Sequence, residues 1–222
     1  MYVPMIKICC IMNRKELNIA LDHGIRCVGF VSSMPSGPGI ISDEEIKALA
    51  EYTPKDINTF LLTSLTDPEE ISNQWLYCST KTVQLCSPMI PDSVSGLRDI
   101  ASGIEIVPVV HVEDSGALSK AMSLSNVGDG VLLDSGSNNS VTPRLGGTGE
   151  THNWNISKSI KENISKPLWL AGGLNSDNVV EAMDVVRPDG IDVCSGVRLN
   201  GALDKRKLSE FINAIHNYSS SL

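Results

Sequence analysis

Short apolar runs alternate along the chain with longer amphipathic segments. Runs such as "VGFV", "VPVV" and "LWLA" are continuously apolar, which is typical of parallel strands that are covered on both faces. The segments between them place apolar residues at spacings of three to four, the period of an amphipathic helix. We therefore predict eight strands, at residues 6–10, 27–31, 59–63, 82–86, 106–111, 130–134, 167–171 and 191–194.

Eight helices are predicted in the intervening segments. Two of them carry clear start signals: Ser42 precedes three acidic residues, and Asp67 precedes Pro68 and two glutamates. A capping side chain, acidic residues in the first turn and proline at the first helical position all favour a helix start. The helices are expected near residues 13–23, 43–52, 67–77, 92–102, 114–124, 153–163, 176–186 and 204–217.

Eight strand–helix units in one chain of this length predict an α/β fold. We expect a (β/α)8 TIM barrel, formed by residues 1–222 as a single domain. An open, doubly wound sheet would produce the same alternation, and it stays as the alternative on pattern alone. No linker or repeat divides the chain. The longest irregular stretch, residues 135–149, is long enough for an active-site loop.

The composition narrows the range of partners. The 222 residues are 41% apolar, and the formal net charge is −8. An acidic chain without a run of Lys or Arg offers no electrostatic surface for nucleic acid or an anionic membrane, so a small-molecule partner is expected. The N-terminal apolar stretch has one early positive charge, Lys7, and is interrupted by Pro4. It is predicted to be neither a signal peptide nor a membrane span, and the protein is expected in the cytoplasm.

The six cysteines form no C-x-x-C pattern, and the four histidines are scattered. A metal site or a disulfide framework is therefore not expected. The adjacent pair Cys9 and Cys10 still needs an explanation. Neighbouring side chains on a regular strand point to opposite faces, so we expect one thiol at the barrel mouth and the other facing the helical layer or the strand-end loop, without a joint role.

The chemistry of such a barrel is expected at the carboxyl ends of the strands. These ends are polar but carry few charges, and glycines cluster late in the chain, in "GGTG", "AGG" and "SG". Glycine lets backbone N–H groups approach an anion closely, and the loops after strands seven and eight of a barrel often hold phosphate. We predict a phosphate site in these three loops. The alternative is that the glycines only form tight turns.

Eight stretches of the chain stand out: "KICC", "VGFV", "VQL", "LLDSG", "LGGTG", "LAGGLNSDNV", "VRPDGIDVCSGVR" and "DKRKLSEFI". Together they resemble the phosphoribosylanthranilate isomerase family, the (β/α)8 enzymes of tryptophan biosynthesis. The likeness runs from Lys7 to about Ile212. It implies an Amadori rearrangement, in which a phosphoribosylamine opens its ring and becomes a 1-amino-1-deoxyribulose phosphate, with no metal and no organic cofactor.

The resemblance also implies roles for individual residues. The family's general base falls on Cys9 and its general acid on Asp134. The acid protonates the ring oxygen, and the base removes the proton from C2 of the ribose. Gln84 and Asp192 match polar residues of the family's strands four and eight, and both are expected to bind the substrate. The residues expected to bind the phosphate are Gly147, Gly149, Gly172, Gly173, Ser195 and Gly196.

The chain departs from the family at the site itself. The family carries an arginine after strand two that holds the anthranilate carboxylate, whereas the loop "SSMPSGPGIIS" has none. Cys10 replaces the family's glycine, Cys86 a histidine, and Arg198 a glutamate. We predict that Arg144 binds the substrate in place of the missing arginine, with Arg198 as a second candidate. The alternative is that both arginines are solvated loop residues.

Three functions stay open on the sequence. The favoured one is isomerisation of phosphoribosylanthranilate. The second is an isomerase, epimerase or lyase that acts on another sugar phosphate with the same Cys9 and Asp134. The third is a non-catalytic protein that binds a phosphosugar, although such a protein has no need of an acid and a base. The sequence does not indicate an oligomeric state.

Overall fold

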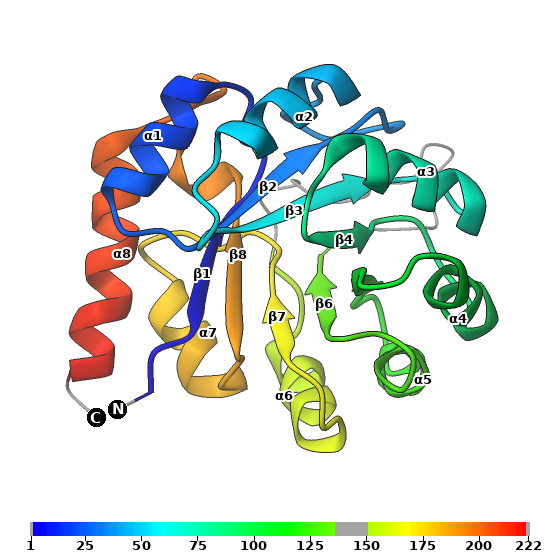
Figure 1. Ribbon diagram of the computed structural model, residues 1–222. Helices are drawn as coiled ribbons and strands as arrows, with labels where there is room; N and C mark the ends of the chain where they lie inside the picture. Colours follow the sequence, from blue (N-terminus) through cyan, green and yellow to red (C-terminus); the bar gives the residue numbers. More distant parts are fainter. Residues whose placement is uncertain (1, 136–150, 221–222) are drawn as a thin grey trace.

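The computed structural model describes residues 2–135 and 151–220. Eight parallel strands form a closed barrel in chain order (Figure 1). β1 pairs with β2 on one side and with β8 on the other, so the barrel is confirmed and the open sheet is excluded. The strands are β1 (Met5–Ile8), β2 (Cys27–Val31), β3 (Asn58–Thr63), β4 (Thr82–Leu85), β5 (Glu105–His111), β6 (Val131–Asp134), β7 (Leu168–Leu170) and β8 (Gly190–Val193).

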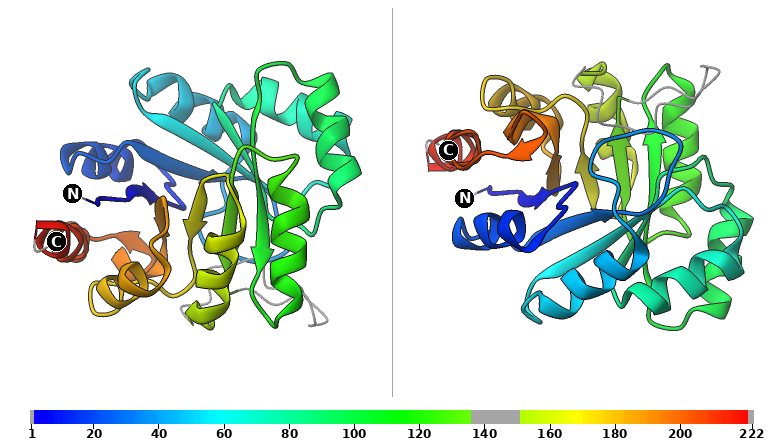
Figure 2. Two further views of the ribbon diagram at one scale, coloured as in Figure 1. Left: turned by 90° about the horizontal axis from the view of Figure 1, so that it is seen from below. Right: turned by 90° about the horizontal axis from the view of Figure 1, so that it is seen from above.

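The helices lie outside the strands in both views of Figure 2. Both predicted start signals are confirmed. Ser42 and Glu45 form a capping box at α2, and the Asp67 side chain accepts hydrogen bonds from the backbone N–H groups of Glu69 and Glu70 at α3. The helices are α1 (Arg14–Asp22), α2 (Asp43–Tyr52), α3 (Pro68–Cys78), α4 (Pro91–Ile100), α5 (Gly116–Ser125), α6 (Trp154–Asn163), α7 (Val179–Val186) and α8 (Lys205–Ser220).

A short segment follows β8 and leads into α8. It consists of a single 3-10 turn, η1 (Ser195–Val197), and a two-stranded antiparallel hairpin, β9 (Arg198–Leu199) and β10 (Ala202–Leu203). The hairpin contacts α1. The sequence pattern did not predict this segment, which contains Arg198.

The buried residues form two separate clusters. The larger one fills the layer between strands and helices and includes Ile8, Phe30 and Phe211. The smaller one fills the barrel interior and includes Cys9, Phe60, Cys86 and Trp169. Successive residues of a strand alternate between the two layers, as the pleat requires. The interior cluster forms the floor on which the polar side chains of the strand ends lie.

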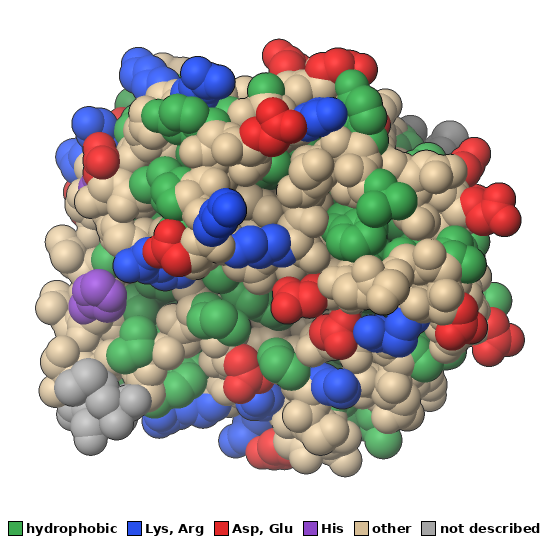
Figure 3. All heavy atoms as spheres, viewed as in Figure 1, with side chains coloured by type: hydrophobic (Ala, Val, Ile, Leu, Met, Phe, Trp, Pro, Cys, Tyr) green, Lys and Arg blue, Asp and Glu red, His purple; other side chains and the backbone are tan. Residues whose placement is uncertain are grey.

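Acidic and basic side chains are interspersed over the face shown in Figure 3. Among the described residues, no helix is long and apolar enough to cross a membrane.

Candidate active site

A pocket of about 600 Å³, counted with the space at its open mouth, lies at the carboxyl ends of the strands. The loop that follows β2 contributes Met34, Ser36, Gly37 and Pro38 to its wall, so this wall is uncharged. The predicted residues that line the pocket are Cys9, Gln84, Asp134, Gly172, Gly173, Asp192 and Ser195. The barrel therefore brings together predicted residues from five different strand ends.

Asp134 is the last residue of β6, and its side chain is almost fully buried. Burial raises the pKa of this carboxyl from 3.8 to about 6, while the N–H of Ser135, which donates to Oδ1 at 2.7 Å, opposes the rise. Desolvation disfavours the charged form of an acid. A carboxyl with this pKa keeps a proton close to neutral pH, which a general acid requires.

Lys7 and Asp192 form an ion pair inside the barrel, which we call the inner pair. Lys7 Nζ lies 3.0 Å from Asp192 Oδ2 and donates to Gln84 Oε1 at 2.5 Å. It also lies 4.6 Å from the centre of the Phe60 ring. Burial opposes the charge on Lys7, but the Asp192 carboxylate outweighs this effect and raises the pKa of the lysine. Among the described residues, Asp192 Oδ1 has no hydrogen-bond partner.

Cys9 follows β1, on the same side of the chain as Lys7 two residues earlier. Its backbone N–H donates to the carbonyl of Val193 at 2.9 Å, which fixes it beside β8. A Cβ atom at Gly29 in β2 would lie 3.2 Å from Cys9 Sγ and 3.1 Å from Lys7 Cε. The missing side chain of Gly29 therefore leaves the room that Cys9 and Lys7 occupy.

The expected opposite orientation of Cys9 and Cys10 is wrong. β1 ends at Ile8, so strand alternation does not extend to either cysteine. Cys10 has a φ of 63°, in the left-handed region. Both cysteines line the pocket and belong to the interior cluster, and Cys10 Sγ lies 2.7 Å from Cys194 Sγ.

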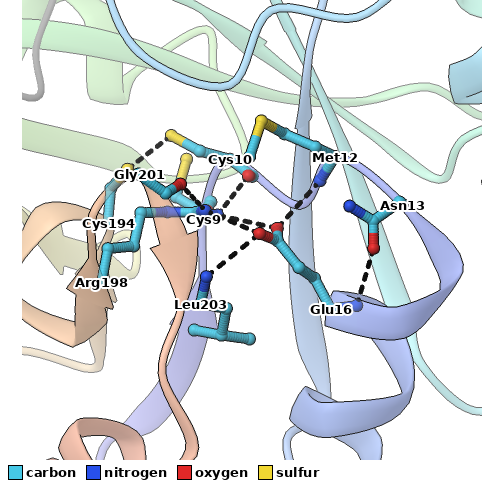
Figure 4. Close-up of polar contacts among 9 residues, drawn as sticks. All are labelled: Cys9, Cys10, Met12, Asn13, Glu16, Cys194, Arg198, Gly201 and Leu203. Atoms are coloured by element: carbon cyan, nitrogen blue, oxygen red, sulfur yellow. Dashed lines mark hydrogen bonds and ion pairs between the residues drawn. The ribbon is translucent and has the colours of Figure 1, made fainter.

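Arg198 and Glu16 form a second buried ion pair, which we call the rim pair (Figure 4). Glu16 Oε1 lies 3.0 Å from Arg198 Nη1, and Oε2 lies 3.1 Å from Nη2. The guanidinium also donates to the carbonyls of Cys9 and Cys10. Both interpretations of Arg198 that the sequence suggested, a carboxylate clamp and a solvated loop residue, are therefore wrong. Arg198 holds the loop that carries the two cysteines.

The glycines that follow β7 and β8 have different structural roles. Gly172 and Gly173 have positive φ values of 87° and 62°, and both line the pocket with Ser195. Gly196 is not part of that wall; a Cβ atom there would lie 2.0 Å from the carbonyl oxygen of Leu174. Glycine at 196 thus lets the loops after β7 and β8 approach each other. Gly147, Gly149 and Arg144 lie outside the described residues.

Cys86 and Gln84 complete the described polar wall. Gln84 Nε2 donates to Cys86 Sγ at 3.7 Å, and burial raises the pKa of the Cys86 thiol to about 12. This thiol is therefore neutral at physiological pH. No group of three or more His, Cys, Asp or Glu side chains in the described part of the chain is placed to hold a metal ion.

The closed barrel and the acid, thiol and glycine loops at the carboxyl ends of its strands define a (β/α)8-barrel enzyme with a small-molecule pocket. Residues 6–214 match the family model described as N-(5'-phosphoribosyl)anthranilate (PRA) isomerase. The chain belongs to this family, which confirms the resemblance seen in the sequence.

Individual relatives agree with this assignment. N-(5'-phosphoribosyl)anthranilate isomerase 2 of Methanosarcina mazei is 32% identical over 96% of this chain and 94% of its own length. The crystal structure of the Thermotoga maritima phosphoribosyl anthranilate isomerase is 26% identical, with a TM-score of 0.83 over 96% of this chain and 99% of its own. A third structure is a phosphoribosyl anthranilate isomerase in complex with reduced 1-(o-carboxyphenylamino)-1-deoxyribulose 5-phosphate. It has 26% identity, a TM-score of 0.79 and the same coverage.

Proposed function

We propose that the protein converts N-(5'-phosphoribosyl)anthranilate into 1-(o-carboxyphenylamino)-1-deoxyribulose 5-phosphate. The observation that carries the proposal is that one pocket contains both a buried carboxyl whose pKa is raised to about 6 and a thiol, in a chain of the PRA isomerase family. This reaction needs one group that gives a proton and one that takes a proton. Asp134 and Cys9 supply these two groups.

Asp134, in its protonated form, gives its proton to the ring oxygen of the ribose. The C1–O bond breaks, and the nitrogen lone pair forms an iminium bond to C1. The Cys9 thiolate then removes the proton from C2, and the electron pair of that C–H bond forms the C1–C2 double bond of an enolamine. The enolamine takes up a proton at C1 while its C2 hydroxyl loses a proton, which gives the 2-keto product. The protons gained and lost then balance, so the reaction is an isomerisation without loss of atoms.

Asp192 and the glycine loops bind the rest of the substrate in this proposal. Oδ1 of Asp192, which has no hydrogen-bond partner within residues 2–135 and 151–220, is buried at the pocket and accepts a hydrogen bond from a ribose hydroxyl. The backbone N–H groups near Gly172, Gly173 and Ser195, together with Gly147 and Gly149, bind the phosphate. Gln84 Oε1 already accepts a hydrogen bond from Lys7, so Gln84 contacts the sugar through its Nε2 amide hydrogens.

The anthranilate ring is expected against the loop after β2, where Met34 and Pro38 give an apolar surface. This loop carries no cation for the carboxylate. Since Arg198 is held by Glu16, Arg144 is the remaining candidate of the two. Arg144→Ala is expected to lower kcat/KM by about one to two orders of magnitude, the effect of a lost charged hydrogen bond. An unchanged kcat/KM would remove Arg144 from the site.

The test is growth of a tryptophan auxotroph that lacks the isomerase. The wild-type protein should restore growth without tryptophan, whereas Cys9→Ser and Asp134→Asn should not. Cys78→Ala, which removes a buried thiol at the end of α3, is the matched control and should restore growth. If the folded wild-type protein fails, the alternative is favoured, namely an isomerase, epimerase or lyase acting on a different sugar phosphate.

The partner and the location follow from the same proposal. The substrate is a phosphorylated sugar derivative, and the protein acts in the cytoplasm on a small molecule and not on nucleic acid. The acidic net charge of −8 supports this choice of partner.

A further inference from the structure

The pocket contains a pair of thiols that the proposed mechanism does not use. Cys10 Sγ and Cys194 Sγ lie 2.7 Å apart, and both residues line the pocket as free cysteines. Cys10 belongs to the loop after β1, and Cys194 follows β8. The contact therefore joins the segments that follow the first and the last strand of the barrel (Figure 4). Cys194 is partly exposed, which opens the pair to a small reagent in the pocket.

The surroundings of the two sulfurs differ. The hydrogen bond with Cys10 lowers the pKa of Cys194; burial opposes this effect, and the Arg198 guanidinium supports it. The same hydrogen bond raises the pKa of Cys10 well above its usual value. Of the two sulfurs, Cys194 therefore loses its proton more readily, and Cys10 keeps its proton. A thiolate beside a cation is the reactive form of cysteine.

The backbone of Cys10 supplies a second observation. Its φ of 63° is a left-handed conformation, which is strained for an L-residue and which glycine adopts freely. Such strain is found where the surrounding structure enforces it, often at functional sites. The rim pair enforces it here, because Arg198 donates to the carbonyl of Cys10 itself. The strained turn brings the Cys10 thiol into the same pocket as Cys9.

We propose that Cys10 and Cys194 are a redox-active dithiol, which closes to a disulfide when a hydroperoxide enters the pocket. The required movement is small, since the sulfurs need only approach from 2.7 Å to about 2.05 Å. Cys9, the general base, is not part of this dithiol, although its side chain hydrogen-bonds with that of Cys10. Reversible disulfides of this kind are a known mode of redox sensing in reducing compartments.

The chemistry has two steps. The Cys194 thiolate attacks one oxygen of the hydroperoxide; the O–O bond breaks, hydroxide or alkoxide leaves, and Cys194 becomes a sulfenic acid. Cys10 then attacks the sulfenic sulfur, loses its proton, and expels water as the S–S bond forms. For hydrogen peroxide the sum is two thiols plus one peroxide giving one disulfide and two waters. A dithiol reductant reverses the change by thiol–disulfide exchange.

The disulfide is expected to slow the enzyme, and this part of the inference rests on the proposed function. Cys9 directly precedes Cys10 in the chain. Ser195, which lines the pocket and is predicted to bind the phosphate, directly follows Cys194. Drawing the two sulfurs together moves the general base and the phosphate loop at once. Misplacement of a catalytic group by about 1 Å can cost about a hundredfold. For the smaller movement here we expect kcat/KM to fall about tenfold and to recover with reductant.

The disulfide is tested without reference to activity. The folded full-length protein is treated with one equivalent of hydrogen peroxide, the remaining thiols are alkylated, and proteolytic peptides are identified by mass spectrometry. The expected product is a cross-linked peptide pair containing Cys10 and Cys194, lighter than the reduced pair by two hydrogens. A bond between Cys9 and Cys10, or six alkylated thiols after treatment, would overturn the assignment.

Three variants separate the steps. Cys10→Ala should stop at the sulfenic acid of Cys194, which dimedone traps, and Cys194→Ala should show no cross-link and no trapped acid at position 10. Cys78→Ala is the matched control and should form the disulfide as the wild-type protein does. If the cross-link forms while PRA turnover by the oxidised protein stays unchanged, the regulatory part fails but the redox site stands. If the reduced protein does not turn over PRA, the proposed function fails independently.

Discussion

The inner pair and the rim pair are both buried ion pairs that join the N-terminal strand region to the C-terminal one, yet they are built differently. In the rim pair, each oxygen of Glu16 accepts two hydrogen bonds: Oε1 from Arg198 and Leu203, and Oε2 from Arg198 and Met12. In the inner pair, one oxygen of Asp192 contacts Lys7 and the other has no partner among the described residues.

This difference separates two uses of buried charge. A carboxylate whose hydrogen bonds are all made to the protein can only hold structure, and Glu16 holds the loop that carries Cys9 and Cys10. A buried carboxylate with an unused oxygen carries a desolvation cost that a ligand can repay. Asp192 is therefore placed for the substrate; burial raises the pKa of its carboxyl, and the Lys7 ammonium opposes this rise.

Breaking the rim pair should have the largest effect on stability. Glu16→Gln leaves the Arg198 charge buried without a counter-charge, and we expect the free energy of unfolding to fall by about 3–5 kcal/mol. Urea denaturation measures this change. The double variant Glu16→Leu with Arg198→Met should regain part of the stability but not kcat, because the contacts to the carbonyls of Cys9 and Cys10 stay lost. A loss below about 1 kcal/mol for Glu16→Gln would contradict the structural role of the rim pair.

Neutralising the inner pair at its open end should affect catalysis and also destabilise the fold, because Lys7 then lies buried without a counter-charge. The loss of stability should be smaller than for Glu16→Gln, since a buried lysine can lose its proton and an arginine cannot. Asp192→Asn keeps the shape of the side chain but weakens the hydrogen bond to a ribose hydroxyl by about 1.5–3 kcal/mol, so kcat/KM for PRA should fall about 10- to 100-fold. Steady-state kinetics provide the measurement, with a denaturation curve as the control for folding. An unchanged kcat/KM would place Asp192 among the structural residues instead.

The inner pair should also tune the general acid. The Asp134 carboxyl has a pKa of about 6 and the Lys7 charge lowers it, so Lys7→Met should raise that pKa. Difference infrared spectra of wild type against Asp134→Asn, recorded over pH, follow the carboxyl directly. A raised pKa means that protonation of Asp134 favours the folded state as pH falls from about 6 towards 4. A wild-type midpoint near 4 would contradict the assignment of Asp134 as a proton donor near neutral pH.

Breaking a surface ion pair should have the smallest effect on the free energy of unfolding, and it serves as the reference for the two buried pairs. Arg206 and Glu210 both lie on α8, and Arg206 Nη1 is 2.7 Å from Glu210 Oε1. Their side chains are 71% and 47% exposed. Exposed pairs of this spacing contribute about 0.3–0.5 kcal/mol. Arg206→Gln should therefore change the free energy of unfolding by no more than about 0.5 kcal/mol in the same urea experiment. A loss as large as that of Glu16→Gln would mean that burial does not explain the difference between the pairs.

The fold could be predicted from the sequence because each strand and helix carries its own local pattern. Every predicted strand boundary lies within two residues of the observed one. The boundary error that mattered most is the end of β1, which lies at Ile8 and not at Cys10. The alternation rule therefore failed at Cys10, since a positive φ in the loop has no signature in a run of apolar residues.

The candidate site was predicted in part. Cys9, Gln84, Asp134 and Asp192 lie on one pocket because they occupy strand ends, which the pattern locates. Lys7 was missed as a site residue, although a lysine inside an apolar strand, two residues before Cys9, was a usable signal for an inward charge. Arg198 was misread because its partner, Glu16, is 182 residues away in the sequence. No local pattern indicates a contact of that separation.

The rate of PRA isomerisation by the purified protein tests the account most directly. Wild type, Cys9→Ser and Asp134→Asn would be assayed for the ketose product, after circular dichroism shows that all three are folded. We expect turnover by the wild type and a fall in kcat of about 10²–10⁴-fold in each variant, the usual contribution of a general acid or base. Turnover by either variant within about threefold of the wild type would contradict it.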